Sequence, residues 1–256
     1  MKKNKVKEKL AAGKVSVGLW SSIGSPDVAE ALANIGFDWI VFDMEHGPLT
    51  IDKVQTSIMA MSGTETVPMI RVACNDPVLI KGALDIGAYG LVIPLVNNKD
   101  EAIRAVSACK YPTKGIRGVS PRRASTYFLD IKDYLKRADE EIMLIPQIEH
   151  IDAVNNLNEI LSVDGIDAFF IGPWDLSASM GYITELPKIH PEVAETINRV
   201  LKAGKRHGVP AGIWGGSVEN VKKYAAQGFQ FITLGEDLDY ILKAQEDYEK
   251  ILEIVK

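Results

Sequence analysis

Short apolar runs alternate with longer amphipathic stretches along almost the whole chain. The runs are rich in Val, Ile and Phe, end in Gly or Asp, and are separated by segments with helical periodicity. We interpret eight runs as buried strands: Val15–Trp20, Trp39–Asp43, Pro68–Val72, Gly90–Leu95, Met143–Ile148, Ala168–Gly172, Pro210–Trp214 and Phe231–Gly235. The segments between them predict helices at Pro26–Ile35, Ile51–Met61, Pro77–Ile86, Lys99–Cys109, Ala153–Leu161, Glu192–His207 and Val218–Gln227, with a further helix near Ile131–Ala138.

Local signals at the helix ends agree with this division. Ser25, Asp76 and Ser217 stand where N-caps are expected, and Pro26 and Pro77 follow as first helical residues. Several predicted helices end in Gly, the preferred residue after a helix C-terminus.

Continuous apolar strands alternating with helices predict a parallel sheet covered on both faces. Eight strands favour a closed (β/α)8 TIM barrel over an open doubly wound sheet, and 256 residues is close to the roughly 250 typical of that fold. The first strand-to-helix turn, residues 22–26, lacks the glycine pattern of dinucleotide-binding sheets. We therefore expect a single barrel domain over residues 1–256.

Composition narrows the function classes. The net charge of −5 is unfavourable for a sequence-independent nucleic-acid binder, and no stretch approaches the roughly 20 apolar residues of a membrane span. The Lys-rich start, residues 1–14, is not followed by the apolar run of a signal peptide. Two cysteines, Cys74 and Cys109, form no disulfide framework, so we expect a cytoplasmic protein.

Polar residues collect where predicted strands end, which is where a (β/α)8 barrel carries its active site. The second strand runs into Asp43 and His46, and the third ends at Arg71. The fifth and sixth strands are followed by a further set: Gln147, Glu149, Gly172, Pro173, Trp174 and Asp175. We expect these side chains to converge on one mouth.

Glu149 and Asp175 are the candidate metal ligands. Two carboxylates on neighbouring strand ends repel each other unless a cation lies between them, and oxygen ligands suit a hard divalent ion such as Mg²⁺ or Mn²⁺. Asp175 has a plainer interpretation as a helix cap, whereas a charged Glu149 beside a core strand needs a partner.

His46 is the candidate general base. Asp43 is placed to orient its ring, and an imidazole held in this way can act as a general base. Arg71 offers a planar donor fork for a carboxylate or enolate oxygen. Its alternative role is a structural ion pair with Asp43 or Glu45.

Five passages in these regions resemble the class II pyruvate aldolases of the HpcH/HpaI family, such as 4-hydroxy-2-oxoheptanedioate aldolase and 2-dehydro-3-deoxyglucarate aldolase. They are residues 36–46, 70–72, 117–119, 147–149 and 170–177. Their order is that of the family, and the Asp-x-Glu-His and Gly-Pro-x-Asp-Leu pieces together are specific.

The resemblance implies a fold, a reaction and a set of roles. The fold is a TIM barrel, and the reaction is reversible cleavage of a 4-hydroxy-2-oxo acid to pyruvate and an aldehyde, with Mg²⁺, Mn²⁺ or Co²⁺ and without a Schiff base. The assembly is a homo-oligomer, with a hexamer as the size that the family suggests. The implied residues are His46 as proton acceptor held by Asp43, Arg71 on the enolate, Glu149 and Asp175 on the metal, Gln147 and the Gly172–Pro173–Trp174 turn on the substrate, with the amide of Trp174 on the pyruvate carboxylate.

The resemblance also assigns an acidic residue that raises the basicity of the histidine, and it matches Asp85. The predicted topology puts Asp85 near the end of a helix, away from the mouth of its own barrel. This residue would therefore serve the site of a neighbouring subunit.

Two tryptophans depart from the family pattern. Trp174 and Trp214 replace smaller residues, and an indole at the end of the seventh strand is expected to reshape the aldehyde pocket. Two alternatives stay open: an acyl-CoA carbon–carbon lyase that uses the basic segment 114–123 for the CoA phosphates, and a non-catalytic barrel that binds a 2-oxo acid.

Overall fold

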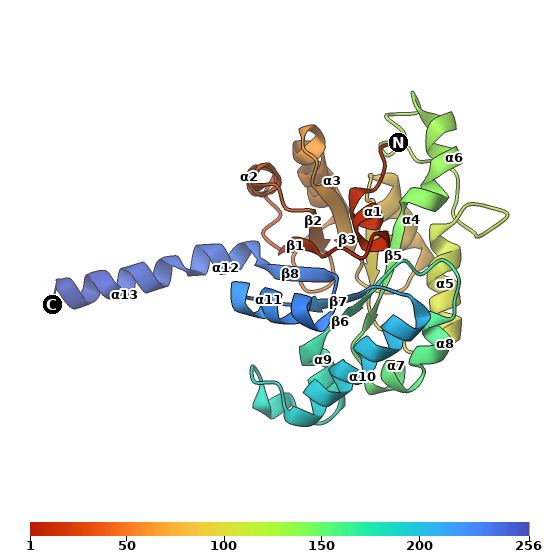
Figure 1. Ribbon diagram of the computed structural model, residues 1–256. Helices are drawn as coiled ribbons and strands as arrows, with labels where there is room; N and C mark the ends of the chain where they lie inside the picture. Colours follow the sequence, from red (N-terminus) through yellow and green to blue (C-terminus); the bar gives the residue numbers. More distant parts are fainter. Residues whose placement is uncertain (256) are drawn as a thin grey trace.

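Eight parallel strands close into a barrel in the computed structural model, which describes residues 1–255 (Figure 1). Each strand pairs with the next in the chain, and β8 pairs with β1. The strands are β1 (Ser16–Ser21), β2 (Trp39–Asp43), β3 (Val67–Arg71), β4 (Gly90–Ile93), β5 (Met143–Ile148), β6 (Phe169–Ile171), β7 (Ala211–Trp214) and β8 (Phe231–Glu236). The predicted (β/α)8 fold is confirmed.

Helices surround this barrel. They are α1 (Lys5–Ala11), α2 (Pro26–Ile35), α3 (Ile51–Ala60), α4 (Pro77–Asp85), α5 (Lys99–Cys109), α6 (Ile131–Glu141), α7 (Ile151–Asn155), α8 (Leu157–Leu161), α9 (Pro173–Ser179), α10 (Pro191–His207), α11 (Val218–Gln227), α12 (Asp237–Leu242) and α13 (Ala244–Ile254). Two short 3-10 helices, Met61–Gly63 and Ile183–Glu185, complete the set.

The helix boundaries follow the local signals closely, with one correction. Ser25, Asp76 and Ser217 each accept a hydrogen bond from an amide in the first turn of the following helix. The single helix predicted over Ala153–Leu161 is instead two, because Asn156 leaves the helical conformation at φ −96° and ψ 9° between α7 and α8.

The core has two layers. Apolar side chains between the strands and the outer helices form the larger one. The barrel interior holds the second layer, in which aliphatic side chains surround four aromatic rings: Trp39 stacks on Phe231 with centroids 4.1 Å apart, and Trp20 lies 5.6 Å from Phe170. These four rings form the aromatic floor of the barrel mouth.

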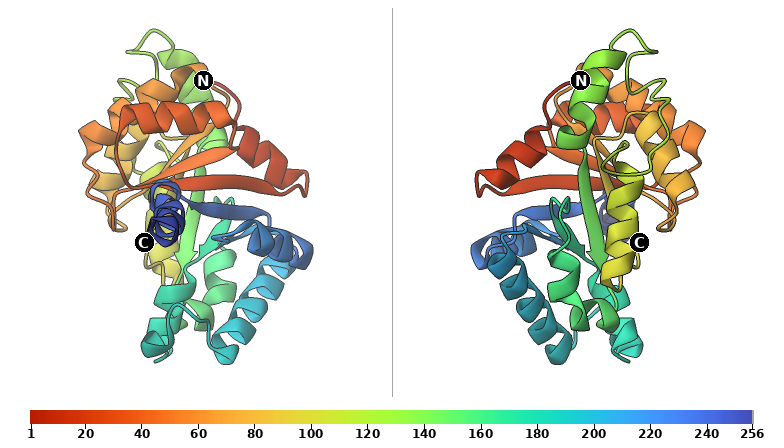
Figure 2. Two further views of the ribbon diagram at one scale, coloured as in Figure 1. Left: turned by 90° about the vertical axis from the view of Figure 1, so that its left-hand side faces the viewer. Right: turned by 90° about the vertical axis from the view of Figure 1, so that its right-hand side faces the viewer.

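The last two helices leave the barrel. α12 follows β8 at the mouth, and α13 continues outward to the C-terminal end as an isolated rod (Figures 1 and 2). No residue of α13 is buried. Of the helices within residues 1–255, none has the length and apolar character to cross a membrane.

Candidate active site

Asp43 and Arg71 form a buried ion pair across the ends of β2 and β3. The two residues are partners in the strand register, so their side chains leave the sheet side by side. Nε of Arg71 donates to Oδ1 of Asp43 at 2.9 Å, and Nη2 donates to Oδ2 at 2.6 Å. Burial acts to raise the pKa of Asp43, but the hydrogen bonds and charge of Arg71 outweigh it and hold the pKa below its usual value. The structural ion pair considered for Arg71 is therefore present.

The expected contact between Asp43 and the ring of His46 is not formed. Oδ1 of Asp43 instead accepts from the backbone amides of Glu45 and His46, at 3.0 and 3.3 Å. The His46 side chain is 64% exposed, and its Nε2 lies 3.7 Å from Oε2 of Glu45. Asp43 thus shapes the loop that carries His46, because its oxygens are already taken by Arg71 and these amides.

Arg71 lies on the aromatic floor. Its guanidinium carbon is 4.4 Å from the centroid of the Trp20 ring, and Nε1 of Trp20 donates to Thr233 at 2.8 Å. Trp214 packs beside Trp20 with centroids 6.2 Å apart. Trp214 is half-buried at the end of β7 and packs against the barrel interior, so its indole lies on the inner side of the mouth.

Glu149 and Gln147 form the second polar group, on β5 and the residue that follows it. The amide of Leu95 donates to Oε1 of Glu149 at 2.8 Å, and Nε2 of Gln147 donates to its other oxygen. Burial raises the pKa of Glu149 to about 7, and the charges of Glu45 and Asp175 add to the rise. Among the described residues, Glu149 is therefore a buried acid without a cationic partner.

Glu45 is a second acid with a raised pKa, but it is only partly buried and has a cationic neighbour. Burial raises its pKa to about 7 against the attraction of Arg71, whose Nη1 is 3.2 Å away, and the charges of Asp43 and Asp175 contribute to the rise. Asp175 is exposed in the first turn of α9, two residues after Pro173. It is not the N-cap, since Gly172 occupies that position. Glu45, Glu149 and Asp175 thus act on one another electrostatically at the same mouth.

The donors at this mouth fit a hard cation held by few protein ligands. Within residues 1–255 no group of three or more His, Cys, Asp or Glu side chains is arranged to hold a metal ion. Mg²⁺ commonly takes only one or two carboxylates and completes its shell with water. Oε1 of Gln147 and Oε2 of Glu45 are buried without a hydrogen-bond partner in the described residues. A Cβ on Gly172 would lie 3.1 Å from Oε2 of Glu149, so only glycine leaves this space open.

The turn into α9 carries the remaining predicted substrate contacts. α9 begins at Pro173 directly after β6, and Trp174 is 58% exposed on its first turn. An amide that opens a helix is suited to an anion. The contact of the Trp174 amide with a carboxylate stays a prediction.

Asp85 lies elsewhere. It is the last residue of α4, which leads into the amino-terminal end of β4. Nη2 of the fully buried Arg117 donates to its Oδ1 at 2.8 Å, and burial raises its pKa above the usual value despite this pair. As the topology led us to expect, Asp85 is remote from the mouth of its own barrel.

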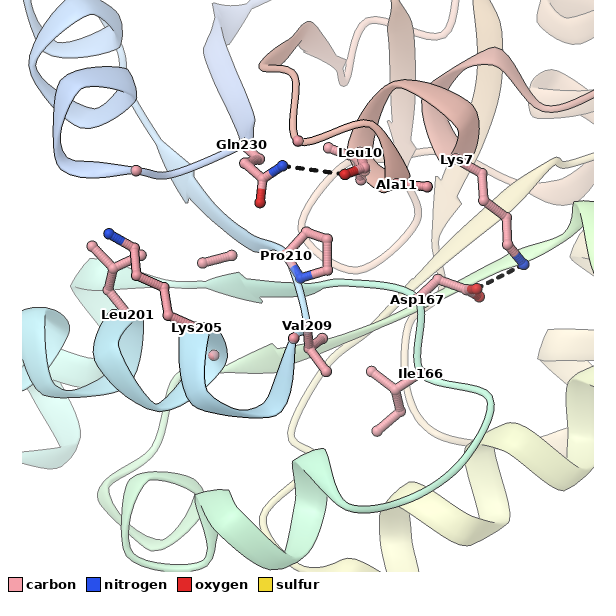
Figure 3. Close-up of a pocket in the computed structure, with 15 residues that line it drawn as sticks. Lys7, Leu10, Ala11, Ile166, Asp167, Leu201, Lys205, Val209, Pro210 and Gln230 are labelled. Carbon is pink, nitrogen blue, oxygen red and sulfur yellow. Dashed lines mark hydrogen bonds and ion pairs between the residues drawn. The ribbon is translucent and has the colours of Figure 1, made fainter.

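A cavity of about 490 Å³ also lies away from this mouth (Figure 3). Residues that precede β6, β7 and β8 line it together with α1. Lys7 pairs with Asp167 at 2.7 Å on its wall, and Gln230 donates to the carbonyl of Leu10 at 3.2 Å. The cavity therefore lies at the amino-terminal ends of the strands. In (β/α)8 barrels this face contributes to stability, whereas the active site lies at the carboxyl-terminal ends.

Sequence reasoning missed three residues of the mouth. Glu45 is part of the Asp-x-Glu-His motif, but the sequence suggested for it only an ion pair with Arg71. Leu95 has φ 53° just after β4, which aims its amide at Glu149. Trp20 lies under Arg71, and only the alternation of side chains along β1 hinted at its inward direction.

Comparisons with known proteins identify the family of this chain. The sequence model of the family described as HpcH/HpaI aldolase/citrate lyase matches residues 16–244. A 5-keto-4-deoxy-D-glucarate aldolase from Citrobacter koseri is 38% identical over 243 residues, which cover 95% of this chain and 94% of the relative. The enzyme of that name from Salmonella arizonae is 40% identical over 235 residues, with 92% and 91% covered.

A solved structure gives the same result. A HpcH/HpaI aldolase/citrate lyase family protein from Burkholderia cenocepacia J2315 superposes with a TM-score of 0.91 at 35% identity, over 98% of this chain and 99% of that one. The chain belongs to the HpcH/HpaI aldolase/citrate lyase family, and it is an aldolase, a carbon–carbon lyase.

Proposed function

We propose that this enzyme is a class II pyruvate aldolase that reversibly cleaves a 4-hydroxy-2-oxo acid into pyruvate and an aldehyde. The proposal assigns the divalent cation to Glu149 and Asp175, with Mg²⁺, Mn²⁺ or Co²⁺ as the candidate ions. The names of the relatives support an aldol reaction on an oxo acid.

The observation that carries the metal assignment is the imbalance of charge at the mouth. Glu45 and Glu149 are acids whose pKa is raised to about 7, and the charge of Asp175 adds to both shifts. Arg71, the cation beside these acids, is already shared between Asp43 and Glu45. When bound, a divalent ion supplies positive charge that polarises substrate oxygens and stabilises an enolate.

The side chains then have separate tasks. In the cleavage direction His46, through a water molecule, accepts the proton of the C4 hydroxyl, the C3–C4 bond breaks, and its electron pair becomes the enolate of pyruvate. Arg71 stabilises that enolate through its Nη1 edge, which faces Glu45 rather than Asp43. Gln147, Gly172, Pro173 and the amide of Trp174 hold the oxo acid.

Metal removal tests the proposal directly. EDTA treatment should abolish retro-aldol cleavage of 4-hydroxy-2-oxo acids and exchange of the pyruvate methyl protons, and Mn²⁺, Co²⁺ or Mg²⁺ should restore both. Full activity in a metal-free sample contradicts the class II assignment. Borohydride with pyruvate should leave no adduct, because the reaction needs no Schiff base.

The acyl-CoA alternative is disfavoured by the position of its basic segment. Arg117 is fully buried against Asp85, and Arg123 donates to the carbonyl of Ile86 at 2.7 Å. Both therefore lie at the end of α4, behind the barrel mouth, where they cannot anchor CoA phosphates beside Glu149. Proton exchange of pyruvate separates the enzyme from a silent 2-oxo-acid-binding barrel, since a mere binder does not exchange.

We also propose that the chain is a homo-oligomer and that α13 packs on a second copy of it; the hexamer stays the size implied by the resemblance. Tyr248 and Ile251 on α13, and Val255 just after its end, follow one another at helical spacing and are 61%, 53% and 70% exposed. On the barrel itself α11 has no buried residue, which is unusual for an outer helix of this fold. In the same assembly Asp85 would meet the mouth of the partner subunit.

A cytoplasmic location is the last part of the proposal. Cys74 and Cys109 are both free thiols, which suits a reducing compartment.

A further inference from the structure

The buried carboxylate of Asp237 accepts several hydrogen bonds where the paired strands β8 and β1 end. Only 3% of the residue is exposed, yet its oxygens accept hydrogen bonds from the hydroxyl of Ser21 at 2.7 Å, the amide of Ser22 at 3.0 Å and the amide of Ile23 at 3.2 Å. The Ser22 hydroxyl, at 3.2 Å, is a further donor. A buried carboxylate is costly unless it is bonded in this way. Asp237 therefore fixes the last residue of β1, Ser21, and the first two residues of the β1–α2 loop, Ser22 and Ile23.

The β1–α2 loop packs directly against the loop that carries His46. A Cβ added to Gly24 would lie 2.4 Å from Cδ2 of Leu49, and one added to Gly47 would lie 3.5 Å from Cβ of Ser22. Gly24 thus permits the close approach of the two loops, and Ser22 is at ordinary van der Waals distance from the position of a Cβ on Gly47. A displacement of Ser22 or Gly24 would be transmitted to Gly47 and Leu49, which follow His46 in the chain.

His46 depends on its backbone for its position. Its side chain is 64% exposed, with only the 3.7 Å approach to Glu45 beside it. Its amide is held from the inside by Asp43 at 3.3 Å. From the outside, the same loop rests on residues that Asp237 holds. The imidazole is therefore placed by two buried carboxylates, neither of which contacts the ring.

We propose that Asp237 is a positioning residue for His46, acting through the β1–α2 loop. The inference rests on the proposed function, in which His46 moves the proton. Asp237 also begins α12, the helix that leads into the projecting α13. The same carboxylate therefore connects the β1–α2 loop beside the site to α12, the helix that leads into the proposed interface helix α13.

A double-mutant cycle on the full-length, metal-loaded enzyme tests this role. Asp237→Asn keeps the volume but turns an amide NH₂ toward amide donors, so the loop should shift. We expect retro-aldol kcat to fall about 10- to 100-fold, the loss that a displacement of about 1 Å of a reacting group can cause. In a His46→Ala background the same substitution should cost less than about twofold, because the residue that it positions is gone.

Asp239→Asn is the matched control. Asp239 accepts from the amide of Glu236 at 2.9 Å in the first turn of the same helix. It should leave kcat within about twofold of wild type. If Asp237→Asn does not fold, Ser21→Ala removes the 2.7 Å hydrogen bond to Asp237 and replaces Asp237→Asn in the double-mutant cycle with His46→Ala.

The outcomes separate the two proposals. Equal losses from Asp237→Asn in both backgrounds indicate a general structural role and overturn the inference alone. A folded Asp237→Asn enzyme with wild-type kcat overturns it as well. A His46→Ala enzyme with unchanged turnover overturns both the proposed base and this inference.

Discussion

At the scale of single residues, the chemistry of the mouth depends on which acids have a cationic partner. Asp43 has Arg71 at 2.6 Å, so its charge is stable and its task is to hold structure. Glu149 has only an amide and the Gln147 side chain, and burial raises its pKa to about 7. A paired carboxylate resists protonation, whereas an unpaired buried one is ready to accept a cation.

His46→Ala should lower retro-aldol turnover by about 10²–10⁴, the usual contribution of general acid–base catalysis. The exposed ring makes no packing contact that the fold needs, so the melting temperature should stay close to wild type. Stopped-flow detection of pyruvate release measures the rate. Near wild-type proton exchange in this variant would assign the base elsewhere.

Trp214→Leu should change aldehyde preference while pyruvate exchange stays within a few-fold of wild type. The indole lies 6.2 Å from Trp20 on the inner side of the mouth, and apolar pocket changes are worth roughly 1–3 kcal/mol of discrimination. Retro-aldol assays on a panel of 4-hydroxy-2-oxo acids measure the preference. If the indole serves only packing, melting temperature and all activities should fall together.

Cys109 should resist alkylation in the folded enzyme. Burial raises the pKa of its thiol to about 12, against the opposing charges of Lys110 and Arg117, so it stays protonated between pH 6 and 9. Cys74 is exposed. Mass spectrometry after iodoacetamide at about pH 8 should find one label, and two after unfolding in guanidinium. Comparable labelling of both thiols in the native state would contradict this burial.

At the scale of elements, the β6–α9 junction brings the helix start beside the proposed metal ligands. Gly172 has φ −92°, which any residue adopts, so its importance lies in the missing side chain. A Cβ there would lie 3.0 Å from Cβ of Glu149 and 3.1 Å from Nε2 of Gln147. The glycine therefore keeps the ligand side chains where the strand ends put them.

Gly172→Ala should weaken Mn²⁺ binding by at least about tenfold with a melting temperature within a few degrees of wild type, because Glu149 must shift to admit a methyl group. Electron paramagnetic resonance of free Mn²⁺ gives the dissociation constant. Gly82→Ala is the control, since a Cβ at that helical position meets nothing within 4 Å. Unchanged Mn²⁺ affinity in Gly172→Ala would remove Glu149 from the ligand set.

At the scale of the whole molecule, the described residues form a closed barrel and one projecting helix, α13, of which no residue is buried. The exposed residues of α13 include Ile254 at 82% and Ile251 at 53%, which is costly for a helix left in water. Association with another copy would bury this stripe.

A Tyr248→Asp/Ile251→Asp double variant should therefore reduce the mass measured by light scattering relative to wild type. Glu253→Gln, on the polar side of α13, should leave the mass unchanged. The variant should also lose activity if Asp85 serves the partner's site. A monomeric wild-type enzyme would overturn the proposed assembly.

The sequence by itself determined the order of the elements and the face on which the chemistry lies. Val/Ile-rich runs and amphipathic periods are local properties, and caps such as Asp76 are read from adjacent residues, so β2, β5, α2 and α11 were predicted residue for residue. A parallel barrel then brings the strand ends to one mouth, which is why Arg71, Glu149 and the other strand-end residues could be predicted to lie near one another.

Only the tertiary structure decided which side chains contact one another and in which direction α13 extends. Asp43 is three residues from His46 in the chain, yet its side chain turns to Arg71, because a bidentate ion pair across neighbouring strands is stronger than one bond to an exposed ring. Nor does a helical period say where a helix points: α13 has an ordinary amphipathic pattern, and its projection from the barrel depends on packing over long distances. The Asp43–Arg71 ion pair and the direction of α13 both depend on residues that are distant in the sequence, and the hydrophobic periodicity of the chain does not specify such contacts.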